Sequence, residues 1–114
     1  MVDKYIRVSK ADGTWSVRAA GAIIAESENA IELIEGDYPP VIYFPRADIA
    51  MAFLEPSERR SHCPHKGDAV YFSIVAKSGT IADVAWSYPE PKEIAEGIAD
   101  HIAFFTDRVT VERI

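Results

Sequence analysis

Short segments of alternating apolar and polar residues, separated by glycine and proline, run through most of this chain and constrain its fold more than any other feature. In the first third, turns are expected at Asp12-Gly13, Gly21 and Gly36. Around them lie four alternating segments, residues 5–9, 14–18, 22–25 and 30–34. A period of two places successive side chains on opposite faces of a strand. This region is therefore predicted to form short strands joined by tight turns.

The middle of the chain continues the pattern. Residues 41–44 form an apolar strand that Pro45 ends, and residues 47–54 have room for only a brief helical turn before Pro56. Residues 70–76 and 81–87 flank the turn at Ser78-Gly79 and are predicted to pair as a hairpin.

The C-terminal part contains the one predicted helix. Pro91 suits its first turn, and the apolar residues Ile94, Ile98 and Ile102 recur every four positions. Residues 103–105 and 109–113 are predicted to form a closing hairpin. Because strands and helices do not alternate, we predict a single domain, 1–114, that is mainly β and antiparallel, with one short helix near the C-terminus.

Composition and charge indicate which classes of partner to expect. The chain has 114 residues, is 48% hydrophobic and carries a formal net charge of −6. No stripe of lysine and arginine is present, which disfavours a nucleic acid polymer or an anionic membrane surface as partner. The apolar stretch 19–25 is far shorter than the roughly 20 residues of a membrane span. The first residues lack the apolar core of a signal peptide, and the chain contains a single cysteine, Cys63. Both features predict a cytoplasmic protein.

Residues 62–72 gather the only cysteine, two of the three histidines and a Lys66-Gly67 turn that opens onto a strand. Such a platform holds side chains rigidly, as binding and catalysis require. A nearby ammonium would favour the nucleophilic thiolate of Cys63, whereas a free cysteine more often packs in a core, so both roles stay open. Asp68 is a candidate for acid–base chemistry or for stabilising the turn.

His62, Cys63 and His65 are residue types that bind zinc. Three ligands within four residues match no common zinc spacing, and no Cys-x-x-Cys partner exists. We therefore expect no metal, and a site on these residues is the least favoured alternative.

Two cations are candidates for binding an anion. Lys66-Gly67 lacks the spacer and the Ser/Thr of a P-loop, so Gly67 is expected to supply a positive-φ turn and Lys66 a single ammonium. Arg46 follows the strand that Pro45 ends, and a guanidinium can hold a carboxylate or phosphate through two hydrogen bonds.

Four aromatic residues lie at strand ends: Tyr43, Tyr71, Trp86 and Tyr88. Such side chains either fill a core or wall a pocket in which a heterocycle or cation stacks. Strand alternation places Trp86 and Tyr88 on one face, so the two can share a wall.

Four motifs in this order resemble those of domain-of-unknown-function family 427, small bacterial and fungal proteins with a nucleotidyltransferase-like name. They are Tyr43-Phe-Pro-Arg46, Cys63-Pro-x-Lys66-Gly67-x-Ala69-x-Tyr71, Ala85-Trp86-Ser87-Tyr88-Pro89-x-Pro91 and Ala103-Phe-Phe. The resemblance implies a β-tent-like fold of two sheets that meet at an angle. Related domains hold zinc through two Cys-x-x-Cys knuckles, which this chain lacks, or form aromatic cages for small cyclic ligands. By similarity to the cages, Trp86 and Tyr88 would line a pocket, with a rim of Arg46, Cys63, Lys66 and Tyr71.

The predicted function is that of a small bacterial domain that binds a nucleotide or another anionic heterocyclic molecule. The alternative is a non-catalytic binding or interaction module built on an aromatic cage. In an enzyme, Cys63 or Asp68 would be the reactive group, and Lys66 would stabilise negative charge. The ligand-binding residues would be Tyr43, Arg46, Gly67, Tyr71, Trp86 and Tyr88. Both functions require Arg46, Lys66, Cys63 and Trp86 to surround one hollow. The sequence indicates no particular cofactor and no particular oligomeric state.

Overall fold

The computed structural model describes residues 6–114, so Tyr5, the first residue of the first predicted strand, lies outside the described residues. Ten strands and three short 3-10 helices make up this part of the chain. The strands are β1 (Ile6–Lys10), β2 (Trp15–Ala19), β3 (Ala22–Ser27), β4 (Ile31–Glu35), β5 (Val41–Pro45), β6 (Leu54–Cys63), β7 (Gly67–Ala76), β8 (Gly79–Ser87), β9 (His101–Phe104) and β10 (Thr110–Arg113). The helices are η1 (Arg46–Asp48), η2 (Met51–Phe53) and η3 (Glu93–Ile98), and within 6–114 no helix has the length and apolar character of a membrane span.

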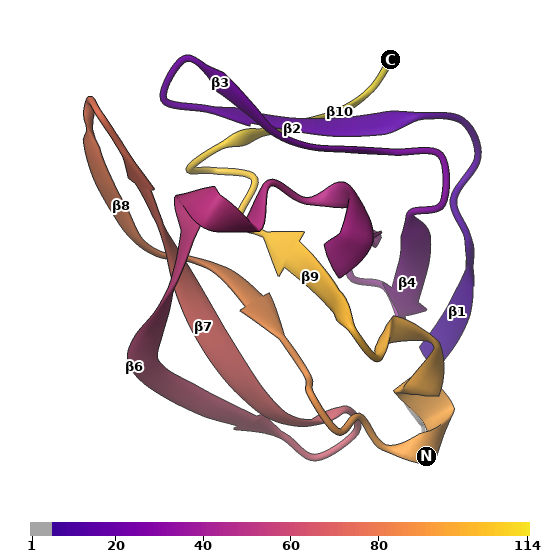
Figure 1. The fold of residues 1–114 in the computed structure, drawn as a ribbon. Helices are drawn as coiled ribbons and strands as arrows, with labels where there is room; N and C mark the ends of the chain where they lie inside the picture. The colour runs from indigo at the N-terminus through magenta and orange to yellow at the C-terminus, as the bar shows by residue number, and fades with distance from the viewer. Residues whose placement is uncertain (1–5) are drawn as a thin grey trace.

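The strands pair antiparallel in two sheets. One sheet has seven strands in the order β1-β4-β5-β9-β8-β7-β6, and the other has three in the order β10-β2-β3. Figure 1 shows the smaller sheet lying across one side of the larger, curved one. The predicted mainly β, two-sheet arrangement is confirmed.

The predicted hairpin is present, and the predicted turn at Gly21 also joins two paired strands. β2 pairs with β3 across a tip in which Ala20 and Gly21 have positive φ of 53° and 76°. β7 pairs with β8, as predicted for residues 70–76 and 81–87. The segment after Pro45 forms the brief helical turns η1 and η2, also as predicted.

In the C-terminal part, the structure differs from two predictions. The short helix is present as η3 but ends at Ile98, because the chain turns at Asp100, whose φ is +63°. Ile102 therefore belongs to β9, where it is fully buried. The predicted closing hairpin is wrong: β9 pairs with β5 and β8 at the centre of the large sheet, and β10 pairs with β2. The apolar His101–Phe104 strand gains neighbours on both sides there, which an exposed two-stranded hairpin would not provide.

The seven-stranded sheet is apolar on both faces. One face packs against the three-stranded sheet and includes Phe44, Phe72 and Ile74. The other face carries a second cluster that includes Tyr43 and Tyr71 and has no member from β2, β3 or β10. Successive residues of one strand thus serve opposite faces, as the period of two requires. The second face is the one on which the candidate site lies.

Candidate functional site

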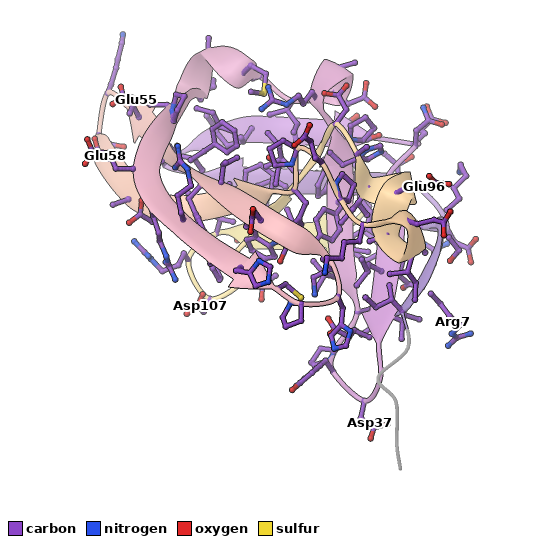
Figure 2. All side chains as sticks on the ribbon, turned by 90° about the horizontal axis from the view of Figure 1, so that it is seen from below. Arg7, Asp37, Glu55, Glu58, Glu96 and Asp107 are labelled. Carbon is purple, nitrogen blue, oxygen red and sulfur yellow. The ribbon has the colours of Figure 1, made fainter. Side chains whose placement is uncertain are left out.

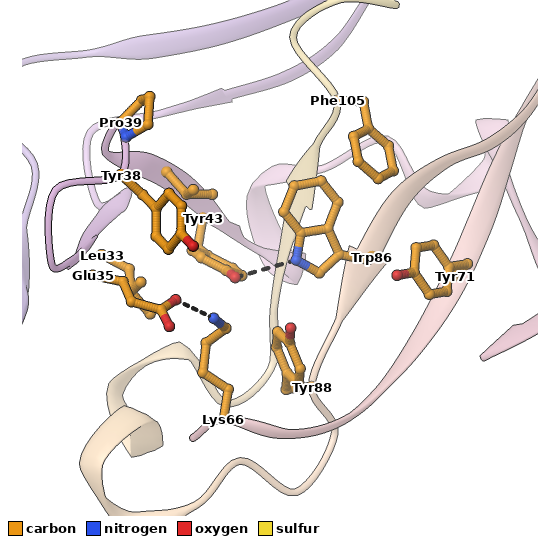
Figure 3. Close-up of a pocket in the computed structure, with 11 residues that line it drawn as sticks. Leu33, Glu35, Tyr38, Pro39, Tyr43, Lys66, Tyr71, Trp86, Tyr88 and Phe105 are labelled. Carbon is orange, nitrogen blue, oxygen red and sulfur yellow. Dashed lines mark hydrogen bonds and ion pairs between the residues drawn. The ribbon is translucent and has the colours of Figure 1, made fainter. Parts of the chain in front are cut away.

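A pocket of about 300 Å³ opens on this second face of the seven-stranded sheet. Its walls come from β4, β5, β7 and β8, from the turn after β6, and from the loops that follow β4, β8 and β9 (Figure 3). The lining residues are Leu33, Glu35, Tyr38, Pro39, Val41, Tyr43, Lys66, Tyr71, Trp86, Tyr88 and Phe105. Segments far apart in the sequence therefore meet around one hollow.

Trp86 is the centre of the aromatic wall. Its indole Nε1 donates a hydrogen bond to the Tyr43 hydroxyl at 3.2 Å, and the two rings meet edge to face with centroids 6.3 Å apart. On its other side the Phe105 ring lies 4.6 Å away at a tilt of 44°. These contacts fix the orientation of the indole before any ligand arrives.

Two tyrosine hydroxyls at the pocket stay neutral. Burial raises the pKa of both Tyr43 and Tyr88 above the ordinary tyrosine value, because an apolar surrounding disfavours the phenolate. The hydrogen bond from Trp86 opposes this effect at Tyr43 without reversing it. Both hydroxyls therefore keep a proton that can be donated to an acceptor.

An ion pair lies beside the aromatic wall. Lys66 Nζ donates to Glu35 Oε1 at 2.5 Å, and both side chains are largely buried, with 12% and 14% of their surface exposed. The ammonium also lies 5.8 Å from the centroid of the Tyr88 ring. The pocket thus presents one cation and one carboxylate to a ligand, as the dashed contact in Figure 3 shows.

Sequence reasoning did not select Glu35 for this pocket. A signal was present, however, since Glu35 has the same strand parity as Leu33, which faces the pocket. A carboxylate that continues the apolar face of a strand must be paired when it is buried.

Five predicted residues line the pocket together: Tyr43, Lys66, Tyr71, Trp86 and Tyr88. Arg46 does not. Its guanidinium lies over the Phe72 ring at 5.3 Å, and its Nε is 3.6 Å from Asp100 Oδ1. Phe72 belongs to the cluster on the opposite face of the sheet, so the expected convergence of Arg46 with Lys66 and Trp86 is not found.

Gly67 and Asp68 also lie outside the pocket lining. Gly67 has φ of +117°, as predicted for its turn, and an added Cβ would approach the Glu90 carbonyl oxygen to 3.3 Å. Asp68 pairs with His62 across the strands, with Oδ1 and Nδ1 2.7 Å apart and both side chains exposed. The backbone of the turn therefore positions Lys66, while Asp68 faces solvent.

Cys63 lies at the end of β6 and packs, partly buried, against the cluster that contains Tyr43 and Tyr88. Within residues 6–114, no group of three His, Cys, Asp or Glu side chains is placed to hold a metal ion. The rate at which the Cys63 thiol reacts with a reagent distinguishes a nucleophile from a packed side chain.

We expect Cys63 to react slowly with a thiol reagent at neutral pH, at least tenfold more slowly than the urea-unfolded chain, because its sulfur is packed against apolar side chains. The measurement is the rate of labelling by a chromogenic disulfide with and without urea. Rapid labelling of the folded protein would instead favour the nucleophile.

The model of the family described as "Domain of unknown function (DUF427)", named NTP_transf_9, matches residues 7–114. No curated protein matches the chain significantly.

Proposed function

The chain belongs to the DUF427 family, and we propose that its pocket binds a small molecule with a flat heterocyclic ring. The ring would stack against the aromatic wall centred on Trp86. Its polar edge would meet the Lys66–Glu35 pair, which offers one donor and one acceptor.

The observation that carries the proposal is the gathering of six aromatic side chains around one hollow, namely Tyr38, Tyr43, Tyr71, Trp86, Tyr88 and Phe105. A core needs no opening to solvent, whereas ligand pockets combine apolar walls with a few placed polar groups. The volume of about 300 Å³ is at the lower end of the range for ligand pockets, so the hollow suits one ring system, and any further group of the ligand would extend beyond it.

The placement of the candidate reactive groups favours the non-catalytic alternative. Of Cys63, Lys66 and Asp68, only Lys66 lines the pocket, and its ammonium already forms an ion pair with Glu35. A binding module needs no nucleophile beside its ligand, so the aromatic pocket suffices for this function. The catalytic roles of the three residues stay predictions.

The test is a binding screen with nucleobases, nucleosides and other nitrogen heterocycles, followed by calorimetric titration of those that raise the melting temperature. Trp86→Ala should weaken the binding of each hit at least tenfold, since base stacking on an aromatic side chain contributes about 1–3 kcal/mol. Trp15→Ala is the matched control, because Trp15 lies on β2 and packs against the other cluster.

The proposal fails if no heterocycle binds, or if the two tryptophan variants bind the hits equally. Circular dichroism of each variant distinguishes a lost contact from a lost fold.

A further inference from the structure

Arg59 lies beside the aromatic wall of the pocket because of an irregularity in the edge strand β6. The pairing of β6 with β7 shifts register between Pro56 and Arg60, so the residues between them leave the ladder. The bulge is held by its own hydrogen bonds: the Arg59 backbone N–H donates to Ser57 Oγ at 3.2 Å, and Arg60 Nη1 donates to the carbonyl oxygens of Ser57 and Arg59 at 2.9 and 2.8 Å. A bulge changes the direction in which a side chain points, and this one directs Arg59 toward the Tyr71 ring.

The redirected side chain lies on the aromatic wall. The Arg59 guanidinium carbon is 4.4 Å from the centroid of the Tyr71 ring and 6.0 Å from that of Phe105. Both rings line the pocket. A guanidinium stacked on a ring keeps its N–H groups, which point outward in the plane, available to an anion.

Among the residues that the structure describes, Arg59 has no acidic partner. Lys66 pairs with Glu35 and Arg46 with Asp100, but in the structure of residues 6–114 no carboxylate lies within ion-pair distance of the Arg59 guanidinium. Arg59 is therefore a cation beside the aromatic wall that is held over two rings and is available to an anionic partner.

We infer that the ligand of this pocket carries an anionic group, such as a phosphate, a short distance from its ring, and that Arg59 binds this group. The inference rests on the proposed function and adds a charge to the ligand. Phe105 contacts both Trp86 and Arg59, so a ring stacked at Trp86 and an anion at Arg59 are separated by about one aromatic ring. A linker the size of one sugar bridges such a gap.

The experiment compares four nucleosides (adenosine, guanosine, cytidine and uridine) with their 5′-monophosphates by calorimetry at low ionic strength. We expect at least one monophosphate to bind tenfold or more tightly than its nucleoside. Arg59→Gln should abolish this preference and leave the nucleoside affinity within about twofold. Arg59→Lys should keep only part of the preference, because an ammonium retains the charge without the two-pronged donor geometry.

The charge-matched control is Arg7→Gln. Arg7 is exposed on β1, at the edge of the sheet opposite β6, and its side chain points away from the fold (Figure 2). This variant should keep the full preference for the monophosphate. An equal loss in Arg7→Gln and Arg59→Gln would mean that net charge alone attracts the anion, and the inference would be wrong.

Two further outcomes separate the inference from the function on which it rests. If heterocycles bind but no monophosphate exceeds its nucleoside, or if Arg59→Gln keeps the preference, the anion site is wrong while the aromatic pocket stands. If neither heterocycles nor monophosphates bind, the inference and the proposed function both fail.

Discussion

Replacing Glu35 by alanine is expected to destabilise the protein by about 3 kcal/mol, because the change leaves the Lys66 ammonium without its partner in a largely buried position. Lys66→Ala should cost a similar amount by leaving the carboxylate unpaired. The measurement is the free energy of unfolding from urea denaturation at pH 7.

Two controls test the cause of this loss. The double variant Glu35→Leu with Lys66→Met removes both charges and keeps most of the volume, so it should recover most of the stability. Glu112→Ala breaks the ion pair between Arg18 and Glu112, which has the short distance of 2.7 Å but lies at the surface, and it should cost at most about 1 kcal/mol. Single variants at Glu35 and Lys66 that cost no more than Glu112→Ala would contradict the prediction.

Raising the pH above 10 is expected to destabilise the protein steeply, because burial raises the pKa of Tyr43 and Tyr88 in the folded state. Above the ordinary tyrosine pKa of about 10, the unfolded chain loses protons that the folded chain retains. The free energy of unfolding then falls by up to about 1.4 kcal/mol per pH unit for each hydroxyl, or about 2.7 kcal/mol for both. Below pH 10 this contribution is fully present.

Urea denaturation between pH 7 and 12 measures the slope, and two variants assign it. Tyr43→Phe and Tyr88→Phe should each reduce the slope of the unfolding free energy above pH 10 by the contribution of one proton, about 1.4 kcal/mol per pH unit. Their values at pH 7 provide the baseline, since both hydroxyls are protonated there in either state. An unchanged slope in both variants would show that these hydroxyls titrate alike in the folded and unfolded chain.

Strands that pair with their neighbour in sequence across a short turn could be predicted from the sequence. The alternating residues locate β2, β3, β7 and β8, although β3, β7 and β8 are longer than the alternating segments, and the short turns between these strands favour their pairing. The same alternation placed Trp86 and Tyr88 on one face, and both line the pocket. Local patterns are sufficient where a strand pairs with its neighbour in sequence.

The edge strand β6 could not be predicted in this way. Apart from Leu54 at its start and Cys63 at its end, its side chains are mainly polar and lie largely in solvent, with Glu55 and Glu58 projecting outward in Figure 2. No apolar alternation marks such a strand. The bulge that redirects Arg59 depends on pairing with β7 and is equally invisible in the sequence.

The sequence analysis selected Arg46 as a candidate cation and did not consider Arg59. Arg46 follows the end of β5 and begins η1, so strand alternation does not set the direction of its side chain. The sequence therefore could not show that Arg46 lies away from Tyr43. Only the three-dimensional pairing of β6 and β7 brings the alternative cation to the aromatic wall.

The two-faced sheet also limits how this domain can vary. In β5 and β7, Tyr43 and Tyr71 serve the pocket, whereas their immediate neighbours Phe44 and Phe72 serve the opposite core. One residue inserted into either strand would exchange the two roles along the remainder of that strand. Side chains that face the pocket can therefore be exchanged without disturbing the opposite core, whereas insertions and deletions are better tolerated in the connecting loops.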